Sequence, residues 1–188
     1  QWLKPVETGL REISDGPDPV FDKLERILSA VHSAYRNKIE ADPIIFALFV
    51  EATREGRGVA RRHRGKVQAE VQRVVEEAGF SPPDQRRALA LIFDMCHRFL
   101  NPASVRTDVE VTRPQIEARF ERVVRALVRL LSDPDCYGEV FNVGNDREVT
   151  INQLAEMIIQ RTGSQSRIRH VPYTDAYGPG FEDMQRRV

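Results

Sequence analysis

The histidines and cysteines are the residues of this chain best suited to metal binding or nucleophilic catalysis. They are His32, His63, His97, His170, Cys96 and Cys136. The histidines show no metal-ligand spacing, and the cysteines lie far apart without a CxxC partner. Cys96 directly precedes His97, but neighbours on a helix point about 100° apart and make a poor catalytic pair. The spacing therefore predicts no metal site, no catalytic residues, and two free, buried cysteines in a reducing cytoplasm.

Seven basic residues between positions 54 and 73 are the candidates for contact with nucleic acid. They are Arg54, Arg57, Arg61, Arg62, Arg64, Lys66 and Arg73, and the flanking glutamates are Glu51, Glu55, Glu70, Glu76 and Glu77. Because acidic residues surround the basic ones, we favour a solvated helix face over a nucleic-acid interface. The whole chain has 28 basic and 28 acidic residues, so its zero net charge gives no electrostatic case for nucleic acid or anionic membrane as partner.

The bulk composition indicates a cytoplasmic globular protein. The chain has 188 residues, 41% of them hydrophobic and 30% charged, which suits one domain, alone or with part of a second. No apolar run approaches the roughly 20 residues that span a bilayer, and no basic-then-apolar signal segment opens the chain. Because the chain begins at Gln1, we expect that its natural start has been removed.

Apolar residues recur at helical spacing through the first two-thirds of the chain. Stripes with a spacing of three and four residues run through positions 21–35, 60–78, 88–99 and 116–130. Asp42 and Pro43 predict a helix start, and the run that follows, 44–50, is apolar on every side, which predicts a helix central to the core. Gly79 and Pro102 predict the ends of two further helices. The pattern predicts a mainly α fold, with five or six helices over 1–131.

The pattern changes after Asp133 and Pro134. Residues 139–143 have strand composition, Thr150 is a helix N-cap ahead of Ile151, and residues 167–171 alternate like a half-exposed strand. We expect a small α/β appendage over 132–188. Its usual packing partners are absent, so we expect it to be mobile or loosely docked.

The helical part resembles the C-terminal part of TetR-family transcriptional regulators. The resemblance rests on residues 30–35, 39–43, 99–103 and 119–124, and it covers residues 1 to about 131. It implies a helical domain that binds a small molecule and dimerises, preceded by a helix-turn-helix domain that we expect to be absent from this chain. Direct binding of nucleic acid is therefore not expected in this form.

The same resemblance implies where the chain dimerises and binds its effector. The helices at about 84–100 and 113–131 would pair with their symmetry mates, although both stripes can also be buried within one monomer. Four residues are pocket candidates for a small apolar effector, namely Phe46, Phe49, Phe93 and His97. The three rings supply apolar area and the histidine a polar anchor, and the competing interpretation for each is plain core packing.

From about residue 123 the chain is similar to the C-terminal end of NAD-dependent epimerase/dehydratases that act on UDP-sugars. Residues 137–145, 150–155, 162–164 and 177–184 support this similarity. It implies that Tyr177 lies near a nucleotide base and Arg187 near the sugar or its diphosphate. For Arg187 we favour a solvated charge at a frayed chain end.

The residues that this enzyme family needs for catalysis are missing. Gly56, Gly58 and Gly65 have the wrong spacing for its phosphate-binding glycine loop, and no strand precedes them. Tyr35 and Lys38 are one residue too close to form the family's Tyr-x-x-x-Lys pair. We therefore expect no cofactor and no enzymatic activity.

The two resemblances overlap in residues 122–131, which indicates a chimera of two genes, natural or artificial. The predicted function is small-molecule sensing and homodimerisation within a transcriptional regulator. The alternatives are a catalytically incomplete UDP-sugar epimerase or decarboxylase fragment, and an inert dimeric scaffold without a ligand.

Overall fold

Helices form nearly all of the regular structure. The computed structural model describes residues 2–108, 111–137, 139–141, 149–172 and 175, and no β-strand occurs among them. The helices are α1 (Leu3–Asp15), α2 (Val20–Ala41), α3 (Pro43–Arg54), α4 (Gly58–Glu77), α5 (Pro82–Met95), α6 (His97–Leu100), α7 (Pro102–Thr107), α8 (Arg113–Ser132) and α9 (Ile151–Thr162), with a 3₁₀ turn at Pro134–Cys136. The predicted mainly α fold is confirmed. The chain divides into two compact units, residues 1–140 and 141–188.

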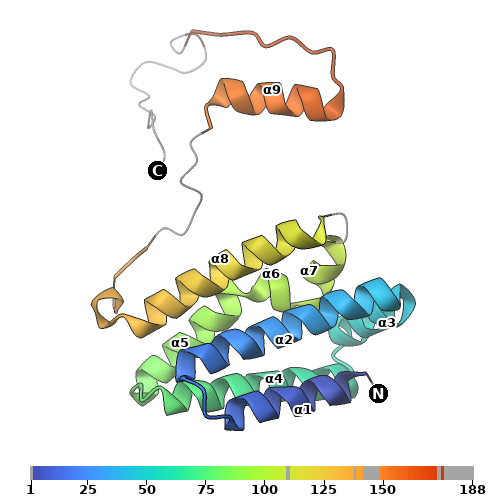
Figure 1. Cartoon of the computed structure of the whole chain (residues 1–188). Coiled ribbons are helices and arrows are strands. Elements are labelled where there is room, and N and C mark those ends of the chain that lie inside the picture. The colour runs from blue at the N-terminus through green and yellow to red at the C-terminus, as the bar shows by residue number, and fades with distance from the viewer. Residues whose placement is uncertain (1, 109–110, 138, 142–148, 173–174, 176–188) are drawn as a thin grey trace. The chain divides into compact units, whose positions relative to one another are not determined.

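Helix α2 is the centre of the first unit. It packs against α1, α3, α4, α6, α7 and α8. In Figure 1, α1 and α4 lie along one side of α2, and α8 lies along the other. The apolar stripe predicted on this helix faces these neighbours, and Leu24, Ile27, Leu28 and Val31 are at most 1% exposed. A fully apolar stripe on a long helix is thus the reason that six other elements can gather around it.

Polar caps followed by proline set three helix starts. Asp42 accepts a hydrogen bond from the Ile45 amide (3.1 Å) ahead of Pro43, and Ser81 caps α5 ahead of Pro82 in the same way. Asn101 accepts from the amide of Ala103 (2.9 Å) ahead of Pro102. Pro102, predicted to end a helix, therefore also begins α7, because proline at the first helical position lacks only an amide that has no partner there.

Two other boundaries differ from the prediction. The expected helix through residue 99 is broken at Cys96 (φ −91°, ψ 2°), which separates α5 from the short α6. Helix α1 was not predicted, although Leu3, Leu10 and the half-buried Val6 already have helical spacing.

The stripes on α5 and α8 are buried largely within the single chain. On α8 the residues at most 5% exposed are Ile116, Phe120, Val124, Leu127 and Leu131. On α5 and α6, Ala88, Ile92 and Phe99 are buried as well, whereas Leu91 and Met95 are only partly covered. Most of the area that the sequence offered for dimerisation is thus used inside the monomer, and any contact through these helices must use their partly exposed flanks.

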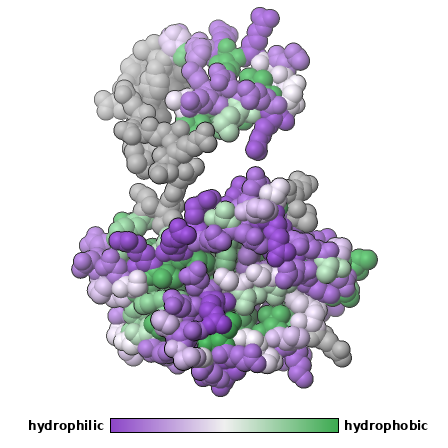
Figure 2. Space-filling view, in the orientation of Figure 1, coloured by the Kyte–Doolittle hydropathy of each residue, from purple (hydrophilic) through white to green (hydrophobic). Residues whose placement is uncertain are grey.

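Helix α3 is not central to the core, contrary to the prediction. Phe46, Phe49 and Val50 are buried, but Ile44 and Leu48 on the other side are 74% and 61% exposed. An all-round apolar helix usually indicates burial on every side, whereas here α2, α4 and α7 pack against one side of it. The first unit, residues 1–140, is called the helical body below. Figure 2 shows its visible face as mostly hydrophilic with scattered hydrophobic patches.

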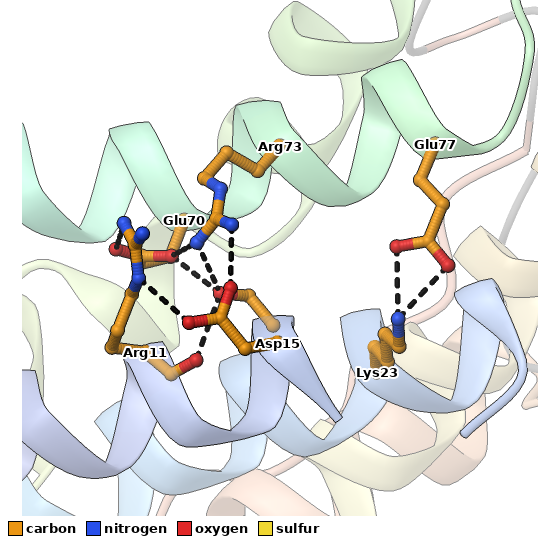
Figure 3. A network of polar contacts seen from close by, with 7 residues as sticks. Arg11, Asp15, Lys23, Glu70, Arg73 and Glu77 are labelled. Carbon is orange, nitrogen blue, oxygen red and sulfur yellow. Dashed lines mark hydrogen bonds and ion pairs between the residues drawn. The ribbon is translucent and has the colours of Figure 1, made fainter. Parts of the chain in front are cut away.

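Polar contacts fix α1 and α2 to α4 (Figure 3). The Ser14 hydroxyl donates to the Glu70 carboxylate at 2.5 Å, and Arg73 donates to both at 3.0 Å. Lys23, 5% exposed, donates to both oxygens of Glu77 at 2.9 Å. These contacts place carboxylates and cations of distant chain segments on adjoining helix faces, and they neutralise Arg73, the last residue of the basic stretch, with Asp15 and Glu70.

The second unit contains α9 and lacks the predicted strand at its end. Thr150 and Gln153 form a capping box at the start of α9, and Gly163 (φ +61°) ends it, which confirms this predicted helix. Residues 167–171 have no regular structure, because an alternating segment needs a neighbouring strand for its backbone hydrogen bonds. Of the other predicted strand, residues 139–141 are irregular, and 142–143 lie outside the described residues.

The body should not depend on the second unit for its stability. All the buried hydrophobic residues of the described chain lie between Leu3 and Leu131. We expect truncation after Val140 to change the free energy of unfolding by less than about 0.5 kcal/mol, the range of a surface change. Urea denaturation followed by circular dichroism would measure this. A loss of more than about 2 kcal/mol would show that residues after 140 stabilise the body.

Candidate ligand-binding cavity

A cavity of about 220 Å³ opens within the helical body. Helices α2 and α3 contribute Val31, Tyr35, Phe49 and Thr53 to its wall. Helix α4 contributes Ala60, His63, Arg64, Val67 and Gln68. The segment from α5 to the start of α7 adds Phe93, His97, Leu100, Asn101 and Pro102. The wall therefore combines apolar and polar side chains in equal number, so a small molecule bound there would meet both kinds of group.

The structure places three of the four predicted pocket residues on this wall. Phe49 is buried there, Phe93 is half-buried, and His97 is exposed at the start of α6. Phe46 is fully buried and does not line the cavity; its ring packs against Tyr35 (6.0 Å between centroids) and Phe49 (6.2 Å). For Phe46 the competing interpretation, core packing, describes its position. Tyr177 and Arg187 lie outside the described residues.

A chain of hydrogen bonds, not predicted from the sequence, joins the wall residues His63 and Tyr35 to Glu7. His63 is 1% exposed, and its Nδ1 lies 3.0 Å from Glu7 Oε1 while its Nε2 lies 3.1 Å from the Tyr35 hydroxyl. Glu7, Tyr35 and His63 come from α1, α2 and α4, so no local spacing could signal them. His63 has helical spacing with apolar neighbours, and that pattern predicts only a core position.

The protonation states in this chain follow from burial and from its partners. Burial lowers the pKa of His63, although the Glu7 carboxylate opposes this, so the imidazole is neutral at pH 7. Burial alone would raise the pKa of Glu7, but hydrogen bonds from Lys66 and His63 outweigh it and lower the pKa. A carboxylate only accepts, which assigns the imidazole proton to Nδ1 and leaves Nε2 to accept from the Tyr35 hydroxyl.

Two ring pairs, both made by Trp2, connect the cavity wall to the beginning of the chain. Trp2 packs edge-on against Phe49, with 5.4 Å between centroids, and against Tyr35 at 6.3 Å. Trp2 therefore contacts two residues that line the cavity, from outside the lining itself.

A second buried histidine lies away from this wall. His32 stacks on Phe120 (4.5 Å between centroids), and its Nδ1 lies 3.2 Å from the Phe99 carbonyl oxygen. Its Nε2 has no hydrogen-bond partner in the described chain. Burial lowers the pKa of His32, as it does that of His63, because a charged imidazole is poorly solvated there.

The cysteines are free, as predicted, but only one is fully buried. Burial raises the pKa of Cys96 to about 12, so its thiol is protonated at neutral pH and unsuited to nucleophilic attack. Cys136 is half-buried, contrary to the prediction, because the turn that carries it lies at the edge of the body. Within the described ranges, no three His, Cys, Asp or Glu residues gather in a way that could hold a metal ion. No helix in those ranges is long and apolar enough to cross a membrane.

Lowering the pH should destabilise the body through these two histidines. Their folded pKa values lie below the ordinary 6.5, so the unfolded chain binds more protons between the two values. The stabilisation that comes from keeping these histidines uncharged is therefore complete above pH 6.5. Below pH 6.5 the free energy of unfolding falls as the pH drops through the folded pKa values, by at most about 1.4 kcal/mol per pH unit for each histidine.

Urea denaturation at pH 5, 6, 7 and 8 measures this dependence. We expect His63→Gln to reduce the slope between pH 5 and 7, because the amide can donate to Glu7 and accept from Tyr35 without taking up a proton. His170→Gln, at an exposed position in the second unit, serves as the control and should leave the slope unchanged. An identical slope in both variants would contradict the assignment to His63.

Comparison with known proteins gives a family match and a partial match to a curated protein. The family model of the tetracyclin repressor-like C-terminal domain matches residues 21–124, just over half of the chain. A UDP-N-acetyl-alpha-D-glucosaminuronate decarboxylase from Bacillus cytotoxicus is 40% identical over 55 residues, which are 29% of this chain and 17% of that protein. The chain thus spans only about a sixth of the length of this relative. No solved structure matches the chain.

The family match includes the elements that build the cavity. Residues 21–124 contain every residue of the cavity wall, from Val31 to Pro102, together with most of α2 and α8. The mainly α fold and the matched range agree. The chain therefore belongs to the family of tetracyclin repressor-like C-terminal domains.

Proposed function

We propose that the helical body is the effector-binding and dimerisation module of a cytoplasmic transcriptional regulator. Domains of this family belong to regulators and are not enzymes, and they typically dimerise and bind effectors. The observation that carries the proposal is the cavity lined by residues of the α2 to α7 region, which lies wholly within the matched range. Its volume of about 220 Å³ suits a small effector with an apolar body.

A thermal-shift screen of small lipophilic compounds tests effector binding. Compounds that bind the cavity raise the unfolding midpoint, because binding stabilises the folded chain by RT ln(1 + [L]/Kd). Ala60→Phe should abolish this effect, because Ala60 lies on the wall and the added ring fills part of the space. Ala69→Phe is the matched control, at an exposed position of α4 outside the wall. If no compound stabilises the chain, or if Ala60→Phe leaves the shifts unchanged, the effector-binding proposal fails.

We place the dimer contact on the partly exposed flanks of α5 and α8. Leu91 and Val123 are only partly covered by the body, and Leu130 is half-buried near the end of α8. Light scattering should give about twice the chain mass of 21.5 kDa. Leu130→Glu should shift the mass toward the monomer, whereas Leu48→Glu on the exposed side of α3 should not. A monomer at all concentrations, or the reverse behaviour of the two variants, contradicts this placement.

The partial relative supports a second proposal, for the end of the chain. A 55-residue stretch that is 40% identical to a sugar-nucleotide decarboxylase supports a chimera, in which the last part of the chain derives from such an enzyme. We expect this part to be catalytically incomplete, so that neither NAD⁺ nor UDP binds in calorimetry. Measurable NAD⁺ binding would instead favour the enzyme alternative. Long-read sequencing of the source locus would show whether the junction is natural.

A further inference from the structure

The interior of the cavity and its mouth offer a ligand different hydrogen-bonding groups. In the interior, the Tyr35 hydroxyl donates to His63, and the Thr53 hydroxyl donates to the Phe49 carbonyl at 2.8 Å. Both hydroxyl protons are therefore used within the protein, and the oxygens that remain offer only lone pairs to a ligand. A carboxylate placed there would meet no donor and would lose its hydration, which is costly.

The mouth, in contrast, presents donors. Arg64 and Gln68 lie one turn apart on α4, and both are exposed. The Oδ1 atom of Asn101 accepts from the amides of Ala103 and Ser104, which leaves the NH₂ group of Asn101 as a donor. No aspartate or glutamate is among the residues that line the cavity. An anion at the mouth would thus meet donors on several sides and no like charge from the wall.

Arg64 differs from the paired basic residues of the same stretch. Arg54, Arg57 and Lys66 each form an ion pair with a glutamate. Arg64 forms no ion pair with any described residue. Burial raises the pKa of the Tyr35 hydroxyl, and the positive charge of Arg64 acts in the opposite direction and lowers it. The guanidinium is therefore close enough to affect the wall electrostatically, and it is not neutralised by a carboxylate of the protein.

From this arrangement we propose that the effector is a small amphipathic carboxylate. Its apolar body lies among Val31, Phe49, Val67 and Phe93, and its carboxylate pairs with Arg64 at the mouth. A cavity of about 150 Å³ holds the six carbons of benzene, so the 220 Å³ here accommodates about nine non-hydrogen atoms, with a head group free to extend into the mouth. An aryl-acetate fits this size, and a planar guanidinium binds its carboxylate with two parallel hydrogen bonds. This inference rests on the proposed effector-binding function.

Three compounds with the same body and different head groups test the proposal, namely phenylacetate, phenylacetamide and 2-phenylethylamine. Calorimetry on the full 188-residue chain should show phenylacetate binding most tightly, the amide more weakly and the amine not at all. Arg64→Gln should raise the dissociation constant for phenylacetate roughly five- to tenfold and leave that for the amide nearly unchanged. The matched control is Arg61→Gln, an exposed arginine one turn earlier that does not line the cavity.

The outcomes separate this proposal from the proposed function. If the amide or the amine binds as tightly as phenylacetate, or if Arg64→Gln has no effect, the carboxylate assignment is overturned while effector binding stands. If none of the three binds, but the lipophilic screen yields compounds whose binding Ala60→Phe abolishes, the carboxylate assignment is again overturned and effector binding stands. If that screen also fails, both proposals fall together. Arg64→Gln changes a surface residue, so its unfolding midpoint should match that of the unaltered chain.

Discussion

Phe46→Ala should lower the free energy of unfolding by about 3–5 kcal/mol, the usual cost of removing a buried phenyl ring. Phe46 is 0% exposed and packs against Tyr35 and Phe49. Truncation would leave a void that α2 and α3 cannot close without moving, because both helices are fixed by other contacts. Urea denaturation monitored by circular dichroism gives the free energies.

Phe93→Ala is the matched comparison for Phe46→Ala. Phe93 is half-buried and lines the cavity, so part of its ring already faces open space. We expect a loss of only about 1 kcal/mol, together with weaker effector binding. Equal losses in the two variants would mean that Phe46 and Phe93 have the same structural role, contrary to the distinction drawn between core and cavity wall.

The second large effect is expected at Glu70, which joins α1 to α4 (Figure 3). Its carboxylate is 11% exposed, accepts hydrogen bonds from Ser14 and Arg73, and lies 3.5 Å from Arg11. Glu70→Ala removes the acceptor of the Ser14 hydroxyl, and Arg11 and Arg73 keep only their ion pairs with Asp15. We expect a loss of about 1–3 kcal/mol in the free energy of unfolding, the range for a buried hydrogen-bond donor that loses its acceptor, because the partly exposed arginines are solvated and keep Asp15.

Two further variants define the source of that loss. Glu70→Gln keeps the size and the acceptor oxygen, so it should cost less than Glu70→Ala. Glu76→Ala removes an exposed carboxylate of the same helix and should change the free energy by less than about 0.5 kcal/mol. A double-mutant cycle with Ser14→Ala should show a coupling near 1 kcal/mol, because the two side chains share one hydrogen bond. Additive losses would locate the effect elsewhere.

Helix positions could be predicted where a local rule governs them. Asp42 with Pro43, and Thr150 with Gln153, specify helix starts through caps that act within four residues of chain. The prediction of a strand at 167–171 was wrong. Alternation of polar and apolar residues shows which side of a strand would be buried, but it does not supply the neighbouring strand that pairing needs. The exposure of Ile44 and Leu48 was missed for a related reason: composition does not show how many neighbours a helix has.

The cavity was predictable only in part. Aromatic residues at core spacing pointed to Phe49 and Phe93, because rings supply most of the apolar area of small-molecule sites. The Glu7–His63–Tyr35 chain was not predictable, because it joins residues 28 and 56 positions apart across three helices. Which apolar residues face a cavity and which fill the core depends on packing between helices, and periodicity within one helix gives only the side that is turned inward.

The position of Trp2 has a practical consequence. It is the one tryptophan of the sequence, so excitation at the red edge of protein absorbance reports a single indole. That indole touches Phe49 and Tyr35, the same rings that an effector would displace or immobilise. Its emission should therefore shift on titration with a bound compound, without any attached dye, and give an optical signal of occupancy from the native chain.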